Sequence, residues 1–227
     1  MNDTRNPGSA TVVLMCGLPV SGKTTTAGRL HAVLGGRLIR SCDVYQRLGI
    51  CLPDWVAKTR GFTEAVDAYE QVRDRAYEEM ARLLEESLAA GETLVILDAV
   101  HCERDKRAVV FDLCHRYAAA PVLVWCRCND PGETERRLVA RRGREAEPER
   151  EASDVSVYRH IASLWDDPVE DDLTIDIAVY DTCTQTVHWV RHGRSSLVEA
   201  IHAALVNTAS GWSSMNRQPK VVAFPPR

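Results

Sequence analysis

The residues best suited to chemistry stand near the start of the chain, in the stretch Gly17-Leu18-Pro19-Val20-Ser21-Gly22-Lys23-Thr24. This stretch matches the pattern G-x-x-x-x-G-K-S/T at every fixed position. Glycine at both ends allows turns that a Cβ would oppose, so successive backbone N–H groups can converge on an anion. The lysine of such a loop reaches the β- and γ-phosphates of a nucleotide, and the hydroxyl that follows is a hard oxygen ligand for Mg²⁺. The stretch therefore predicts a site for ATP and Mg²⁺ that runs from Gly17 to Thr25.

Two aspartates follow apolar runs further along the chain. Asp98 closes the run 94–98, and an apolar strand that ends in aspartate places a carboxylate at the ligand-binding edge of a parallel sheet. Asp98 could hold Mg²⁺ through water or orient an acceptor. Asp43 follows the run 38–41, where a carboxylate would face the γ-phosphate and accept the proton of an attacking hydroxyl group. The alternative for Asp43 is a helix cap for residues 44–48, and the sequence leaves both aspartates open as the general base.

The segment from Glu133 to Glu151 interleaves arginines with glutamates. Such a pattern is typical of a solvated, salt-bridged helix surface. Arg141 and Arg144 differ, because they stand at the expected end of a helix and in the hydrophilic loop after it. Phosphoryl transfer spreads negative charge over the equatorial oxygens, and a mobile arginine can stabilise that charge when a lid closes. Arg141 and Arg144 are therefore predicted catalytic residues of a lid at about residues 141–153.

The elements that must position these residues alternate between strand and helix. Strands are predicted at 11–16, 37–41, 93–98, 121–126, 175–180 and 187–190, and helices at 23–34, 64–90, 104–118, 131–141, 153–165 and 195–206. This alternation implies right-handed crossovers and a mostly parallel sheet with helices on both faces. Ligands of such sheets bind beyond the carboxyl ends of the strands. The predicted fold is therefore α/β, the three-layer sandwich of P-loop NTPases with a helical lid.

Composition excludes several other classes of protein. The formal net charge is −4, so the chain lacks the basic field that non-specific coating of nucleic acid requires. Its longest apolar run is too short for a membrane span, and the polar N-terminus lacks the apolar region of a signal peptide. Neither the cysteines nor the histidines follow a metal-ligand spacing, so the cysteines are predicted to be buried and reduced and the histidines to be non-catalytic. The sequence thus predicts a cytoplasmic protein with reduced cysteines and no membrane partner.

With these motifs the chain resembles the family of small P-loop kinases that includes the 5′-hydroxyl polynucleotide kinase domain, zeta toxins and chloramphenicol phosphotransferase. The similarity covers about residues 11–182 and is greatest to the polynucleotide kinase-like, AAA-type ATP-binding proteins of bacteria. Residues 95–100 resemble the family's V-I-L-D-A-T stretch, and residues 138–144 resemble the lid that supplies its arginines. The resemblance implies that Asp43 is the general base and that residues 153–165 form the helix after the lid.

Three positions depart from the family's pattern. Gln46 stands three residues after Asp43, where many members carry an arginine that in polynucleotide kinases grips a substrate phosphate. Val20 replaces a usual glycine, and Val100 replaces a common threonine. Gln46 and the acidic net charge weaken the case for a polynucleotide acceptor, so a small-molecule acceptor is at least as well supported. The segment 49–66 is expected to line the acceptor pocket.

Together these residues predict a kinase that moves the γ-phosphoryl group of ATP to the hydroxyl group of a small molecule or to a polynucleotide 5′-hydroxyl. Lys23, together with Mg²⁺ held by Thr24 and Asp98, would neutralise the phosphates, and Asp43 would accept the proton. The alternative is an ATPase or a nucleotide-dependent binding module whose only acceptor is water. A switch GTPase is disfavoured, because the chain has no N-K-x-D motif to read guanine. The predicted kinase domain spans residues 11–206, between an N-terminal extension (1–10) and a disordered tail (207–227).

Overall fold

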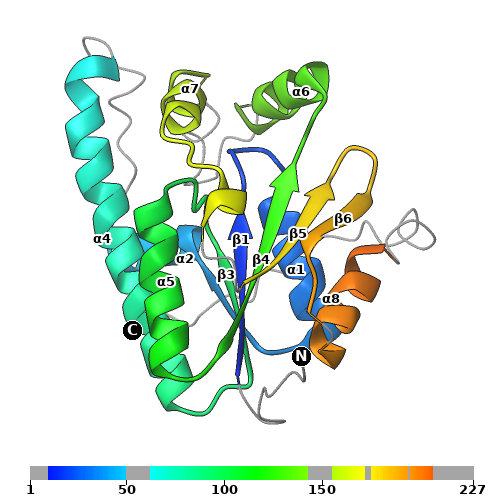
Figure 1. Ribbon diagram of the computed structural model, residues 1–227. Helices are drawn as coiled ribbons and strands as arrows, with labels where there is room; N and C mark the ends of the chain where they lie inside the picture. Colours follow the sequence, from blue (N-terminus) through cyan, green and yellow to red (C-terminus); the bar gives the residue numbers. More distant parts are fainter. Residues whose placement is uncertain (1–9, 50–61, 143–154, 172–174, 194, 207–227) are drawn as a thin grey trace, which may run out of the picture.

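A six-stranded sheet with the strand order β2-β3-β1-β4-β5-β6 forms the centre of the protein (Figure 1). The computed structural model describes residues 10–49, 62–142, 155–171, 175–193 and 195–206. The strands are β1 (Thr11–Cys16), β2 (Arg37–Arg40), β3 (Leu94–Asp98), β4 (Ala120–Arg127), β5 (Asp176–Asp181) and β6 (Thr186–Arg191). The helices are α1 (Lys23–Leu34), α2 (Ser41–Arg47), α4 (Phe62–Ala89), α5 (Arg104–Arg116), α6 (Pro131–Arg142), α7 (Val155–Ser163), the short 3₁₀ helix η2 (Pro168–Glu170) and α8 (Ser196–Val206).

The first five strands pair in parallel, and β6 alone runs antiparallel as the partner of β5. β1 lies between β3 and β4, so its backbone is hydrogen-bonded on both sides and all six of its residues are buried. This is the environment that a continuous apolar run prefers, because both faces of a parallel sheet are covered by helices. The carboxyl ends of β1, β2 and β3 meet at one edge of the sheet, where the P-loop and Asp98 lie. The predicted α/β fold with a mostly parallel sheet is confirmed.

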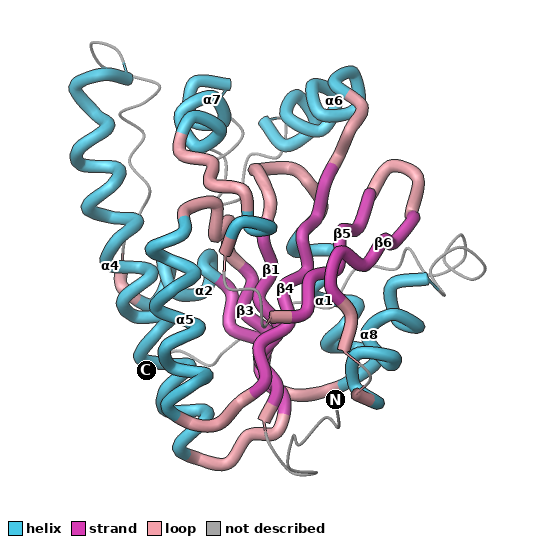
Figure 2. Tube along the Cα trace, in the orientation of Figure 1, coloured by secondary structure: helices cyan, strands magenta, loops and turns pink. Residues whose placement is uncertain are grey.

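Helices cover the two faces of the sheet as separate layers (Figure 2). On one face, α4 and α5 pack against alternate residues of β1, among them Val12 and Leu14. On the other face, α1 and α8 pack against the intervening residues Val13 and Met15. The alternation follows from the strand period of two, which sends successive side chains to opposite faces. The result is a three-layer sandwich with two cores.

A third, smaller core lies beyond the carboxyl ends of the strands, where Figure 1 shows α6 and α7. Tyr69 from α4, Cys102 from the loop after β3, and Val157 and Ile161 from α7 form this cluster. It holds α7 against the outer half of α4 and so closes one side of the ligand-binding edge. In the part of the chain described above, no helix is long and apolar enough to cross a membrane.

Some expectations fall outside the described residues. These are the N-terminal extension up to residue 9, the tail at 207–227, and the part of the lid at 143–153, which includes Arg144. Most of the segment 49–66, which was expected to line the acceptor pocket, is also outside them. The described part of the lid is the end of α6, which carries Arg141.

Candidate active site

The loop between β1 and α1 has the geometry of a phosphate cradle. Gly17 has φ +145° and lies so close to β4 that a Cβ would come within 2.3 Å of the Cys126 carbonyl oxygen. Gly22 has φ +94° and is the N-cap residue of α1, and a Cβ there would meet Thr182 at 2.9 Å. Both glycines are therefore required by backbone conformation and by space. They place the N-terminus of α1, which attracts anions, directly after the loop.

Lys23 and Thr24, the first two residues of α1, meet Asp98 at the end of β3. The Lys23 side chain is buried, and its Nζ donates a hydrogen bond to the Leu18 carbonyl oxygen at 2.7 Å. Burial lowers the pKa of Lys23, whereas the nearby Asp98 carboxylate opposes this shift. Burial raises the pKa of Asp98, and Lys23 and a hydrogen bond with the Thr24 side chain lower it. The ammonium of Lys23 and the carboxylate of Asp98 thus share one poorly hydrated site, where charge interactions are strong, and the exposed Thr24 borders it.

The donor set at this point fits Mg²⁺. The Thr24 hydroxyl and the Asp98 carboxylate are both hard oxygens, and the side chains are linked by a hydrogen bond. Mg²⁺ is usually held by one or two such protein groups together with substrate phosphates rather than by a complete protein cage. Thr24 and Asp98 are therefore the residues that would hold the ion, beside the loop that would hold the phosphates.

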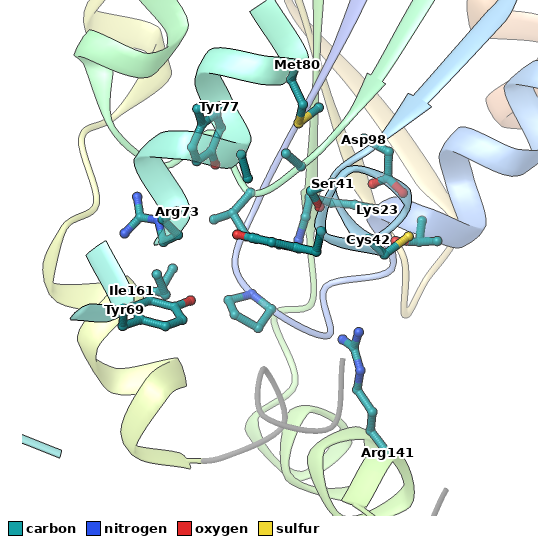
Figure 3. A pocket seen from close by; sticks show the side chains of 16 residues that line it. Lys23, Ser41, Cys42, Tyr69, Arg73, Tyr77, Met80, Asp98, Arg141 and Ile161 are labelled. Carbon is teal, nitrogen blue, oxygen red and sulfur yellow. The ribbon is translucent and has the colours of Figure 1, made fainter. Parts of the chain in front are cut away.

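Two hollows open on either side of Lys23. The first lies between α2, α4 and α7, and its lining includes Tyr45, Tyr69, Arg73, Tyr77, Met80 and Ile161 (Figure 3). The second lies along the start of α1 and the turn after β5, and its lining includes Gly22, Thr25, Arg29, Arg137, Thr182 and Gln185. Lys23, Thr24 and Arg141 line both hollows. Ligands bound in the two hollows would therefore meet at these three residues.

Arg141 lies near the end of α6 and faces the junction of the two hollows. Figure 3 shows its guanidinium extending from α6 toward the side of the pocket that holds Lys23 and Asp98. Its positive charge lowers the pKa of both Lys23 and Asp98, although it is the smallest of the contributions named for either group. The placement is suited to stabilising negative charge on a phosphoryl group between the hollows.

Asp43 lies beside the first hollow rather than among its lining residues. Arg40 holds the Asp43 carboxylate through two hydrogen bonds of 2.9 and 2.8 Å. The interpretation of Asp43 as a helix cap is wrong, because α2 begins at Ser41 with Arg40 at its N-cap and Asp43 lies inside the first turn. The neighbouring Ser41 and Cys42 do line the hollow. Arg40 is also the residue of β2 that pairs in register with Asp98 of β3, so both aspartates are at the same sheet edge.

Arg137 is a residue whose role the sequence did not reveal. Its Nη1 donates to the Val20 carbonyl oxygen at 3.2 Å and to the Thr182 hydroxyl at 3.0 Å, and its Nε donates to Glu133 at 2.6 Å. The Thr182 hydroxyl in turn donates to the Ser21 carbonyl oxygen at 2.8 Å. Arg137 and Thr182 therefore brace the phosphate loop from α6 and from the turn after β5. The charge pattern of α6 grouped Arg137 with surface arginines, and no local signal distinguishes it.

The lining that α4 contributes was also missed. Its helical periodicity predicted the helix correctly, but Tyr69, Arg73 and Tyr77 share a face that only the packing against α2 and α7 turns into a pocket wall. Periodicity identifies a buried face without showing whether the neighbour is protein or ligand.

A parallel sheet with a G-x-x-x-x-G-K-T loop between its central strand and the following helix defines a P-loop nucleotide-binding domain. The chain belongs to the AAA domain family (AAA_33), whose model matches residues 12–159. No curated protein matches the sequence at a significant level.

Solved structures of the same fold cover nearly the whole chain. A candidate kinase from Chloroflexus aurantiacus is 16% identical with a TM-score of 0.60, over 89% of this chain and 99% of its own. A sugar kinase from Janibacter is 16% identical with a TM-score of 0.51, over 88% and 96% of the two chains. The APS kinase of Mycobacterium tuberculosis, solved with AMPPNP and APS, is 14% identical with a TM-score of 0.51, over 89% and 100%. At these identities the similarity establishes the fold.

Proposed function

We propose that this protein is an ATP-dependent kinase that transfers the γ-phosphoryl group to a hydroxyl group of a small molecule. The observation that supports this most directly is the pair of hollows that share Lys23, Thr24 and Arg141. A nucleotide in the hollow along α1 would present its terminal phosphate to a second ligand in the hollow between α2, α4 and α7. An enzyme that transfers phosphate only to water has no need of the second hollow. The fold is shared with a sugar kinase and with an APS kinase, which agrees with this proposal.

The residues at the junction have separate roles in the proposed reaction. Backbone N–H groups of the loop and the Lys23 ammonium hold the β- and γ-phosphates. Mg²⁺, when bound between Thr24 and Asp98, would neutralise part of the phosphate charge. Arg141 faces the same point from α6 and stabilises the charge that develops on the transferred group. Arg137 lines the hollow proposed for the nucleotide and positions the loop through the Val20 carbonyl oxygen.

Asp43 is the proposed general base. Asp98 is already engaged by Lys23 and Thr24, which suits it to the metal ion rather than to a proton from the acceptor. The Arg40–Asp43 pair is exposed, with side-chain exposures of 40% and 51%. An exposed pair of this kind contributes only about 0.2–1 kcal/mol, so an incoming acceptor can displace Arg40 at little cost. The freed carboxylate would then accept the hydroxyl proton as the phosphoryl group is transferred.

Acceptor-dependent labelling tests the proposal. The protein is incubated with γ-labelled ATP, Mg²⁺ and a mixed panel of small alcohols, sugars, nucleosides and 5′-hydroxyl oligonucleotides. We expect label in one class of acceptor and a rate that rises with the concentration of that acceptor. Label found only in free phosphate, at a rate that no acceptor changes, would instead establish an ATPase or a nucleotide-dependent binding module.

A further inference from the structure

The hollow between α2, α4 and α7 has two ends of different chemistry (Figure 3). Lys23, Asp98 and Arg141 gather at the end beside the phosphate loop. Tyr69 and Ile161 lie at the opposite end, and both are nearly inaccessible to solvent, with exposures of 8% and 1%. The cavity volume between the walls is about 100 Å³, so only a compact ligand fits in it. The far end would contact an apolar part of that ligand.

Among the described lining residues, Arg73 is the one cation at the far end. Carboxylates on both sides form ion pairs with its guanidinium. Its Nη1 donates to both carboxylate oxygens of Glu70 at 2.8 Å, and its Nη2 is paired with Glu103. The Arg73 side chain is only 3% exposed. Two carboxylates around one guanidinium leave no positive charge for a phosphate, sulfate or carboxylate of an acceptor. The far end therefore disfavours an anionic acceptor such as a nucleotide.

In the part of this lining that the structure describes, hydrogen-bonding groups at this end are limited to Arg73 and the tyrosine hydroxyls. The Tyr77 hydroxyl already accepts a hydrogen bond from the backbone N–H of His101 at 3.0 Å. The other lining side chains from α4 and α7 include Ala76, Met80 and Ile161, which cannot form hydrogen bonds of ordinary strength. A site that selects a sugar needs buried polar groups matched to its hydroxyls. Aromatic and aliphatic walls instead match a ring or an apolar chain.

We propose, building on the kinase function above, that the acceptor is an uncharged small alcohol with an aromatic body. The ring lies between the tyrosines of α2 and α4 and Ile161 of α7. The reacting hydroxyl reaches the other end, next to Ser41 and the phosphate held by Lys23. Its proton passes to Asp43, its oxygen forms the new bond to the γ-phosphorus, and ADP leaves.

A defined set of acceptors tests this specificity. The probes are 2-phenylethanol and 1-phenyl-1,2-ethanediol, compared with glucose, uridine and a 5′-hydroxyl oligonucleotide, each with γ-labelled ATP and Mg²⁺. We expect kcat/KM for the phenyl alcohols to exceed that for the others by about tenfold or more, the scale on which apolar pockets discriminate. Preferential labelling of glucose, uridine or the oligonucleotide would overturn the aromatic specificity and leave the kinase function standing. Label in free phosphate alone would overturn both.

Variants at Tyr45 separate ring contact from hydrogen bonding. Tyr45 lines the hollow from α2 and is only partly buried, so its replacement is compatible with folding. Tyr45→Ala should raise KM for the phenyl alcohols about tenfold with KM for ATP unchanged, because a ring wall is lost. Tyr45→Phe should retain the wild-type KM, and Val33→Ser, at an exposed site on α1, is the control. If Phe is as damaging as Ala, the hydroxyl rather than the ring binds the acceptor and the proposal is refuted.

A second observation concerns two cysteines at the brace of the phosphate loop. Cys128 follows β4 and Cys183 follows β5, and their Sγ atoms are 2.7 Å apart although both thiols are free. Closing a disulfide of about 2.05 Å would need little movement at this separation. Cys183 directly follows Thr182, and its Sγ is 3.9 Å from Nη2 of Arg137. The thiol pair therefore adjoins both residues that hold the loop carbonyls.

The geometry points to a reversible disulfide between Cys128 and Cys183 that weakens ATP binding. With hydrogen peroxide as the oxidant, the two thiols give up two protons and two electrons, the S–S bond forms, and the peroxide is reduced to two waters. Formation of this bond shifts the Cys183 Sγ, which lies beside Nη2 of Arg137, and so perturbs the brace on Val20 and Ser21. A dithiol reductant restores the original state.

Peroxide treatment of the full chain tests this modification. Peptide mapping should find the Cys128–Cys183 bond in monomeric protein, and the Kd for ATP should rise and then recover after reduction. Cys128→Ser should keep its ATP affinity in peroxide, whereas Val33→Ser, at an exposed site on α1, retains both thiols and should respond like the wild type. An unchanged Kd in protein shown to be oxidised, or bonds between chains only, would overturn the proposal.

Discussion

His101 should make the protein lose stability in mild acid. The side chain is 1% exposed, and its Nδ1 lies 2.9 Å from the Met15 carbonyl oxygen, to which it donates a hydrogen bond. Burial lowers the pKa of His101 from 6.5 to about 4, and the nearby Arg107 guanidinium contributes in the same direction. The folded protein therefore keeps the imidazole neutral at a pH where the unfolded chain protonates it.

The sign and the size of the effect follow from these pKa values. Below about pH 6.5 the unfolded chain binds a proton that the folded protein does not, so acid favours unfolding until about pH 4. At about 1.4 kcal/mol per pH unit, the gap corresponds to a total loss of about 3 kcal/mol, of which about 2 kcal/mol is lost by pH 5. This is a large fraction of the stability of a typical domain.

The substitution His101→Asn isolates this contribution. Asparagine cannot titrate, its amide N–H can replace the Nδ1–H donor, and it tolerates the left-handed backbone of this residue, where φ is +44°. Urea unfolding of both proteins between pH 7.5 and 5 gives the free energy of unfolding at each pH. We expect the wild type to lose about 2 kcal/mol more than the variant over this range. If the free energy of unfolding fell by the same amount in both proteins, the fold would not be keeping His101 neutral, and the reasoning would be refuted.

Three further predictions concern the site and the core. Lys23→Ala should abolish phosphoryl transfer with an unchanged circular dichroism spectrum, and normal turnover would rule out the proposed role of the phosphate loop. Asp43→Asn should slow transfer by about 10²-fold with little change in ATP affinity, as expected for a lost general base, and a collapse of affinity would assign Asp43 to binding instead. Asp171→Asn should lower the free energy of unfolding by about 3–5 kcal/mol, because Arg107, 0% exposed, loses its buried carboxylate partner. Glu170→Gln is the matched control, since this exposed partner of Arg104 should matter by less than about 1 kcal/mol, and equal losses would contradict the argument.

Local signals in the sequence determined much of the fold. The predicted bounds of β1 (Thr11–Cys16) and α1 (Lys23–Leu34) agree with the structure at both ends. These elements have unambiguous boundaries, because a continuous apolar run stops at glycine and a helical pattern begins directly after the loop. Predicted strand 37–41 was one residue too long, since Ser41 already belongs to α2. Extended and helical preferences compete at such a junction, so its position is poorly determined by sequence.

The nucleotide-binding loop was equally readable from sequence, because its chemistry lies in consecutive residues. Gly17 and Gly22 are needed for their own backbone angles and for close approach to neighbouring segments. Asp98 could be placed at the sheet edge because a strand that ends in aspartate must present it there. In each case the functional position follows from the residue's own local element.

Only the tertiary structure decided which distant side chains share a contact. Arg137 reaches Val20 across 117 positions of sequence, and Arg73 is paired with Glu103 across 30. The order β2-β3-β1-β4-β5-β6 brings these segments together, and no local propensity encodes that order. The sequence by itself therefore determined that the protein has a phosphate-binding P-loop at the edge of a parallel sheet. The brace of that loop and the aromatic wall of the second hollow arise from long-range packing, because they depend on which helix faces lie opposite one another.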